Sequence, residues 1–184
     1  MRIIKQITDN KFLNIKEVFD DVKYCHGYQF AERRGKDSIA FIGWDIEQEH
    51  KDAPFLLNCE FTPPTNEFLY RAFGGSLDKA KDKIEIVIEE VREECGYEIT
   101  ARRVAELGNM FVSTQMNQRC YLYFVNLTGA KSVGRKPENK IEAMATLSYR
   151  TKQQILDGDD WKAIVILTKM ANKDSWLSKA DAGY

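Results

Sequence analysis

The sequence predicts an α+β fold in which helices pack on both faces of a mixed β-sheet, an α/β/α sandwich with a strand-rich extension at the N-terminus. Three observations support this prediction. Short β-rich segments fill the first half of the chain, one strongly amphipathic helix follows them, and two further helical segments lie near the end. Strands that flank one helix and precede others suit this layered architecture. With 184 residues, the chain is long enough for one domain with a sizeable core.

Five strands are expected before the first helix. Residues 38–44, SIAFIGW, form a continuous apolar run that suits a strand buried on both faces. Pro63 and Pro64 end the last of the five. The expected strands span residues 2–7, 12–18, 23–31, 38–44 and 55–61. We assign residues 1–36 to the N-terminal extension and residues 37–184 to the main domain.

A helix is expected over residues 82–95. Its apolar residues recur at intervals of three and four, which places them on one helical face. These residues are Ile84, Val87, Ile88, Val91 and Cys95. Gly96 follows the last of them and is expected to cap the C-terminus of the helix.

The second half of the chain is expected to mix strands and helices. A basic loop that contains glycine and proline separates its strands. The expected elements are strands over 98–107 and 120–127, the loop over 129–139, a last strand over 141–147, and helices over 151–157 and 161–170. The tail, residues 173–184, is expected to fray.

The expected helix carries an acidic face. Glu90, Glu93 and Glu94 occupy positions i, i+3 and i+4, which are neighbours on a helix. Carboxylates held this close repel each other unless a cation lies among them, and Mg²⁺ prefers oxygen ligands. Gly74 and Gly75 precede the helix and allow a close approach to the backbone. The alternative is a solvated acidic face, because each like-charge pair costs only about 0.2–0.5 kcal/mol.

Residues 75–97 resemble the Nudix box, the loop–helix–loop signature of Nudix hydrolases. Seven of its positions match at the right spacing, and they are Gly75, Glu90, Val91, Glu93, Glu94, Gly96 and Tyr97. Two positions differ from the pattern. Lys81 stands where the box has a glutamate, and Glu89 stands where it has an arginine. We hypothesise that these two residues form a charge-reversed ion pair; the alternative is two unpaired surface residues.

The resemblance implies a metal-dependent hydrolase, most like the pyrophosphatases that act on ADP-ribose and nucleotide sugars. Such enzymes cleave the diphosphate of a nucleoside diphosphate linked to another group, using water and Mg²⁺ or Mn²⁺. By the matched positions, the carboxylates of Glu90, Glu93 and Glu94 and the carbonyl of Gly74 would bind the metal. Gly75 would let the diphosphate approach the main chain.

The resemblance also implies a general base. In ADP-ribose pyrophosphatases the base is a glutamate on a loop before the last strand and helices, which makes Glu138 the first candidate here and Glu142 the second. In other subfamilies the base belongs to the box, where Glu93 is the candidate. An ordinary loop glutamate is the alternative at both late positions.

Substrate contacts outside the box are expected from aromatic and basic residues. Tyr28, Phe30 and Arg34 in the extension are candidates for binding the base or a phosphate, and Arg71 is a candidate for binding a phosphate. Core or surface positions are the alternatives. The resemblance implies a homodimer that shares substrate contacts through the extension. A second hypothesis is a Nudix-fold binding or regulatory module with weakened catalysis.

Composition argues against several other classes. The net charge of −1 gives no electrostatic argument for nucleic-acid binding. No apolar run approaches the ~20 residues that span a membrane. The N-terminus has no signal-peptide apolar region, so we expect a cytoplasmic protein. The four cysteines lack zinc-site spacing and are expected to be free thiols.

Overall fold

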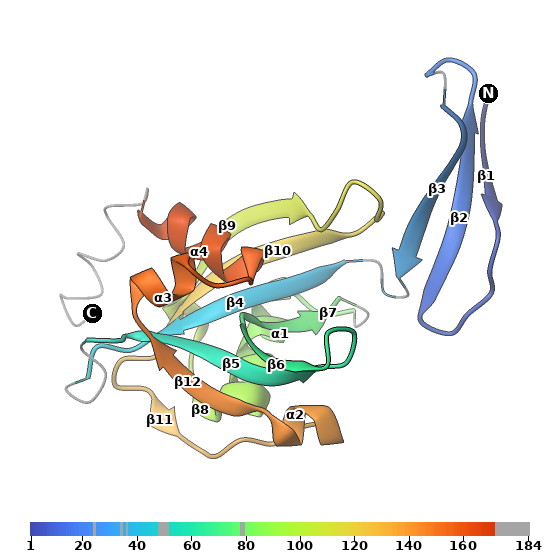
Figure 1. Cartoon of the computed structure of the whole chain (residues 1–184). Coiled ribbons are helices and arrows are strands. Elements are labelled where there is room, and N and C mark those ends of the chain that lie inside the picture. The colour runs from blue at the N-terminus through green and yellow to red at the C-terminus, as the bar shows by residue number, and fades with distance from the viewer. Residues whose placement is uncertain (24, 34, 36, 48–51, 78–79, 172–184) are drawn as a thin grey trace.

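A computed structural model of the chain describes residues 1–23, 25–33, 35, 37–47, 52–77 and 80–171. It has the predicted fold class: a mixed sheet forms the centre of the main body, with helices on both of its faces (Figure 1). The predicted tail lies outside the described residues. None of the helices in the described ranges is both long enough and apolar enough to cross a bilayer.

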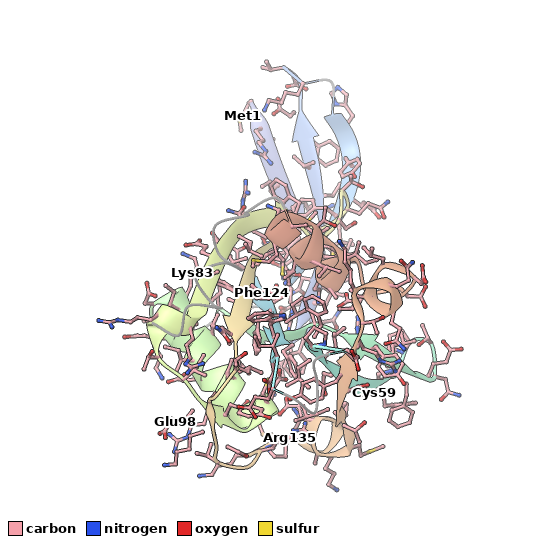
Figure 2. All side chains as sticks on the ribbon, turned by 90° about the vertical axis from the view of Figure 1, so that its left-hand side faces the viewer. Met1, Cys59, Lys83, Glu98, Phe124 and Arg135 are labelled. Atoms are coloured by element: carbon pink, nitrogen blue, oxygen red, sulfur yellow. The ribbon has the colours of Figure 1, made fainter. Side chains whose placement is uncertain are left out.

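The N-terminal extension is a separate antiparallel sheet. Its strands are β1 (Arg2–Gln6), β2 (Leu13–Asp20) and β3 (Cys25–Arg33), in the order β1-β2-β3. This sheet stands clear of the main body, and Figure 2 shows Met1 on it, at the end of the molecule opposite Arg135. Two backbone hydrogen bonds tie it to the body: Ala31 N–H donates to Gln115 O (2.8 Å), and Asn117 N–H donates to Ala31 O (3.0 Å).

The main sheet has the strand order β12-β5-β4-β10-β9. Its strands are β4 (Ser38–Trp44), β5 (Phe55–Thr62), β9 (Val104–Phe111), β10 (Arg119–Asn126) and β12 (Thr146–Arg150). Strands β4 and β10 are parallel, and the other pairs along this path are antiparallel. All seven residues of β4 are buried, which confirms the strand predicted from its continuous apolar run.

Strands β4 and β5 form a fork. They pair at Gly43 and Trp44 and then diverge, and two further strands fill the opening. Strand β6 (Glu67–Arg71) pairs with β5, and β7 (Phe73–Ser76) pairs with β4. The fork therefore opens the sheet next to the glycine pair that precedes the acidic helix.

Two hydrophobic cores fill the body, one on each face of the sheet. Helices α3 (Lys152–Leu156) and α4 (Trp161–Ala171) cover the first core, whose centre includes Phe124 (Figure 2). The acidic helix α1 (Lys83–Glu90) covers the second, which includes Phe41. Burying a side chain such as that of Phe41 stabilises the fold by about 1.5–3 kcal/mol.

Two of the predicted strands differ from the structure. The strand expected over 98–107 is divided into β8 (Tyr97–Glu98), the 3₁₀ turn η2 (Ala101–Arg103) and the start of β9, and β8 pairs with β11 (Lys131–Ser132). The strand expected over 141–147 was wrong for most of its length, because helix α2 (Lys140–Met144) precedes β12. The Asn139 side chain accepts hydrogen bonds from the backbone N–H groups of Ile141 and Glu142, which starts the helix.

Candidate active site

A polar cleft of about 540 Å³ opens at the fork between β4 and β5. This volume is within the roughly 300–1,000 Å³ of small-molecule sites. Five carboxylates from four elements and a loop line it: Glu60, Glu90, Glu94, Glu138 and Glu142. Three basic side chains line it as well: Arg33, Arg71 and Lys162. The cleft therefore combines groups that are distant in the sequence, with carboxylates in excess.

Glu94 is the most deeply placed of these carboxylates. Its side chain is 8% exposed, and it accepts a hydrogen bond from the Gly74 N–H at 3.3 Å. Burial is the main cause that raises its pKa to about 8, and the neighbouring charge of Glu90 is the next. The charges of Glu142 and Glu60 raise the pKa further, while the Gly74 hydrogen bond lowers it. The negatively charged form of Glu94 is thus unfavourable in the folded protein, and either a proton or a bound cation would neutralise it.

A π-helical turn directs Glu94 inward. Helix α1 begins with a capping box, in which the Asp82 side chain accepts from Ile84 N–H and the Glu85 side chain accepts from Asp82 N–H. After Glu90 the chain widens into the π turn η1 (Val91–Cys95). Such turns occur mostly as single turns within α-helices and are frequent at functional sites.

Gly96 ends this turn in the left-handed region, with φ of 76°. A side chain there would also approach Arg135 N to 2.8 Å. Glycine is therefore required at this position by both the backbone conformation and the close loop.

The two glycines before the helix are needed for packing. A Cβ at position 74 would lie 2.7 Å from the carbonyl oxygen of Ile39 on β4. A Cβ at position 75 would overlap the Glu90 carboxylate, so that carboxylate lies directly over the main chain of Gly75. Both glycines line the cleft. They bring strand β7, helix α1 and the Glu90 carboxylate together.

The late loop is fastened to the end of the acidic helix. Val133 N–H donates to Gly96 O (2.8 Å), and Lys136 N–H donates to Glu93 O (2.9 Å). The Arg135 guanidinium donates to the carbonyl oxygens of Ala145 (2.6 Å) and Glu142 (3.1 Å). These bonds fix the loop whose continuation carries Glu138 and Glu142 into the cleft.

The two late glutamates have different surroundings. The Glu142 carboxylate accepts from Glu138 N–H at 2.7 Å and also accepts from the Asn139 side chain, so it braces the loop. The Glu138 carboxylate makes no hydrogen bond or ion pair within the described part of the chain. Of the two, Glu138 has the carboxylate that is available to a ligand.

Lys81 and Glu89 form the hypothesised ion pair. Its hydrogen bond to Glu89 is the main cause that raises the pKa of Lys81 above its ordinary value, and the charge of Glu93 contributes to the same shift. Glu93 is half-buried and is not among the residues that the structure describes around the cleft. The three box glutamates are therefore divided: Glu90 and Glu94 face the cleft, while Glu93 is within electrostatic reach of Lys81.

The predicted substrate contacts are distributed over the molecule. Arg71 lines the cleft, where its Nη1 lies 3.4 Å from the Oε1 of Glu60. Tyr28 and Phe30 line a different cavity, between the extension and the loop after β9, and the Tyr28 hydroxyl donates to Thr114 O at 3.1 Å. Arg34 lies outside the described residues.

The polar residues of the cleft that were not predicted include Arg33, Asn58, Glu60 and Lys162. Asn58 is 2% exposed; its Nδ2 donates to Glu60 at 3.2 Å, and its Oδ1 accepts no hydrogen bond from the described residues. Asn58 and Glu60 are two apart in an otherwise apolar strand, a signal that both face one side. Arg33 donates to the Ser76 hydroxyl at 3.1 Å. Nothing in the local sequence indicates the position of Arg33 or Lys162.

The cleft has donors that suit a hard divalent cation. All five acidic residues that line the cleft are glutamates, and Mg²⁺ and Mn²⁺ prefer carboxylate oxygens as ligands. Within the described ranges, no three Asp, Glu, His or Cys side chains are already gathered as a metal site. Several carboxylates are instead held by protein donors, such as Glu60 by Asn58 and Arg71. Glu94, which needs a positive charge nearby, is the clearest point of fit for a cation.

The fold has a solved counterpart. A crystal structure of an ADP compounds hydrolase aligns with a TM-score of 0.71 and covers 96% of this chain and 92% of that chain, at 11% sequence identity. No protein-family model matches the sequence. No curated protein matches it either. The shared feature is therefore the fold.

Proposed function

We propose that this protein is a Nudix-type pyrophosphatase. It hydrolyses the diphosphate bond of a nucleoside diphosphate linked to a second group, such as ADP-ribose or another nucleotide sugar, and releases a nucleoside monophosphate and a sugar phosphate. The observation that carries the proposal is that Glu94 and Glu90 lie against the backbone of Gly74 and Gly75, in a cleft that Glu138 also lines. The solved counterpart is a hydrolase of ADP compounds, which supports an ADP-containing substrate.

Charge balance requires a cation in this cleft. The cleft has five carboxylates but only three basic side chains, and this excess of acidic groups would repel a diphosphate. Glu90 and Glu94 would hold Mg²⁺ or Mn²⁺, which neutralises diphosphate charge and lowers the pKa of a bound water. Glu93, the third proposed metal-binding carboxylate, lies in the same turn but outside the described lining of the cleft, so its charge would act on the metal from farther away. Arg71, Lys162 and Arg33 surround the cleft as donors to phosphate oxygens.

Glu138 is the proposed general base. It lines the cleft with a carboxylate that no described residue binds, so it can accept a proton from water. Glu142 is the proposed positioning residue, because its carboxylate holds the backbone of Glu138.

The reversed ion pair favours an active enzyme over a weakened binding module. The box arginine is replaced by Glu89, but Lys81 supplies the opposite charge on the preceding loop. The link between loop and helix is kept with the charges exchanged. The box departs from its pattern at two positions, and the two changes compensate each other.

A homodimer is part of the proposal. The three-stranded extension is too thin to bury apolar side chains on both faces by itself. Large apolar side chains remain exposed on it: Ile3, Ile4, Ile7, Phe12, Leu13 and Val22. A cavity of about 620 Å³, lined partly by Ile4 and Tyr28, lies between this sheet and the body. A second copy would cover these surfaces; sedimentation equilibrium would test this, and a monomer at micromolar concentration would contradict it.

The activity is tested with a substrate panel. The protein and Mg²⁺ are incubated with ADP-ribose, ADP-glucose, UDP- and GDP-sugars, NADH and dinucleoside polyphosphates, and released nucleoside monophosphate is measured. We expect turnover of at least one ADP-containing substrate, and its loss in Glu94→Gln and in excess EDTA. Tight binding of one compound without turnover of any would support the binding module instead.

A further inference from the structure

A second pocket, which we name the β6–α4 pocket, lies between strand β6 and the start of helix α4. Its volume is about 320 Å³. Several of its lining residues belong to the core that α3 and α4 cover, among them Leu57, Ile155 and Ala163. Arg71 lines both cavities, so they meet at this side chain. Apart from Arg71, no residue of the β6–α4 pocket has a part in the proposed chemistry.

Arg150 is the unusual group in this pocket. Its Cζ lies 3.3 Å from the centre of the Tyr70 ring, which is a close cation–π contact. Its Nε is buried and donates no hydrogen bond to any described residue. A buried donor without an acceptor is unfavourable. The rest of the Arg150 side chain lines the pocket, so the guanidinium is placed to donate to a ligand there.

The pocket offers flat apolar surfaces beside this edge. Tyr70 is 47% exposed and Phe68 is 53% exposed, although both are large aromatic side chains. Trp161 is half-buried at the start of α4, and the buried Ile155 also lines the pocket. Aromatic faces of this kind stack well against a planar ring.

Asp160 fixes the pocket relative to the cleft. Its carboxylate accepts from Ala72 N–H at 2.6 Å, at the junction of β6 and β7, and from Lys162 N–H at 3.2 Å. This clamp joins the start of α4 to the fork in the sheet. As a result, Trp161 lines the β6–α4 pocket while the next residue, Lys162, lines the cleft.

We propose that the β6–α4 pocket binds the nucleobase of the substrate, stacked against Tyr70 and Trp161 and accepting a hydrogen bond from Arg150. This inference rests on the proposed function, since a diphosphate in the cleft would extend past Arg71 through one ribose. We take the ligand to be an uncharged ring, because Asp159 and Asp160 balance Arg71 and Arg150 in the pocket lining and leave no net positive charge for a second phosphate. A nucleobase has the planar faces and the acceptor edge that these groups require.

Two variants test the pocket, with one matched control. Tyr70→Leu removes the stacking face, and Arg150→Gln removes the guanidinium. Arg119→Gln is the control, because Arg119 also lies over an aromatic ring, 4.2 Å from the centre of Phe111, but lines neither cavity. If Arg150→Gln does not fold, Arg150→Lys takes its place, because lysine keeps the positive charge while it removes the guanidinium.

Binding is measured first without catalysis, by titrating nucleosides and following tryptophan fluorescence and amide NMR shifts. We expect each pocket variant to weaken nucleoside binding by about 5- to 150-fold, the range for one base on an aromatic platform. The control should bind as the wild type does. Equal binding by wild type, Tyr70→Leu and Arg150→Gln would overturn the proposal.

Kinetics then separate this proposal from the proposed function. If the wild type turns over a nucleotide sugar, both pocket variants should raise KM for it while leaving kcat nearly unchanged. Unchanged KM in both variants would refute the nucleobase site and leave the pyrophosphatase proposal standing. If the wild type binds nucleosides through Tyr70 and Arg150 but hydrolyses nothing, the pyrophosphatase proposal fails and the nucleobase site stands.

Discussion

Replacing Glu94 by glutamine should stabilise the metal-free protein while it removes activity. Burial and the charges of neighbouring glutamates raise the pKa of Glu94 to about 8, from an ordinary value of 4.5. Near neutral pH the folded protein therefore holds a proton on Glu94 that the unfolded chain has already released. For an acid whose pKa is raised by folding, stability is highest below the unfolded pKa, falls as pH rises between the two values, and is constant above the folded one.

The size of this effect follows from the two pKa values. Relative to low pH, the shifted pKa of Glu94 lowers the free energy of unfolding by about 1 kcal/mol at pH 5, about 3 kcal/mol at pH 7 and more than about 4 kcal/mol above pH 8. Glutamine has the same shape and keeps an oxygen that can accept from Gly74 N–H, but it carries no charge. The variant should recover most of that free energy.

Urea unfolding in EDTA at pH 5, 7 and 8.5 measures the difference. We expect the Glu94→Gln variant to exceed the wild type in unfolding free energy by an amount that grows with pH. Glu93→Gln is the matched control, because Glu93 lies in the same turn but outside the described lining of the cleft. A Glu94→Gln advantage that is absent, or that is the same at pH 5 and pH 8.5, would refute the electrostatic argument.

Four further predictions concern the same site. Glu138→Gln should lower kcat by about 10²–10⁴-fold with little change in metal affinity, and a loss below tenfold would place the base elsewhere. Lys81→Glu combined with Glu89→Arg should melt at a higher temperature than either single variant; a double variant that melts lowest would contradict the compensated pair. Gly75→Ala should reduce activity, because the added methyl group would overlap the Glu90 carboxylate. If this variant had the same kcat and KM as the wild type, the Glu90 carboxylate would not need its present position over Gly75. Mg²⁺ should raise the unfolding midpoint of the wild type more at pH 8 than at pH 6, and an equal rise would argue against proton release on binding.

The sequence predicted the sheet and the acidic helix because both depend on local patterns. The apolar run of β4 and the three-and-four spacing of α1 are visible in the residues themselves. The failure at 141–147 has a local cause as well: Asn139 caps a short helix where apolar residues suggested a strand. That asparagine was the available signal.

The cleft was only partly predictable, since its other half is a product of tertiary structure. Arg33 reaches Ser76 because β3 of the extension is held against the loop after β9. Lys162 reaches the cleft because Asp160 clamps the start of α4 to the fork. The inward direction of Glu94 depends on a π turn, whereas α-helical spacing predicts one common face for all three glutamates.

The division of the box glutamates gives the acidic segment two tasks. Glu94 and Glu90 face the cleft, where their mutual repulsion is unfavourable for the apo fold and favourable for cation binding. Glu93 instead lies toward Lys81, and its backbone carbonyl holds the late loop through Lys136 N–H. The end of this helix and its π turn thus place the proposed metal ligands and fix the loop that carries the proposed base. A cation gains affinity by relieving the unfavourable charge on Glu94, so a change that stabilised this carboxylate in the metal-free protein would weaken cation binding. The proposed function therefore requires that ionised Glu94 lower the stability of the metal-free fold.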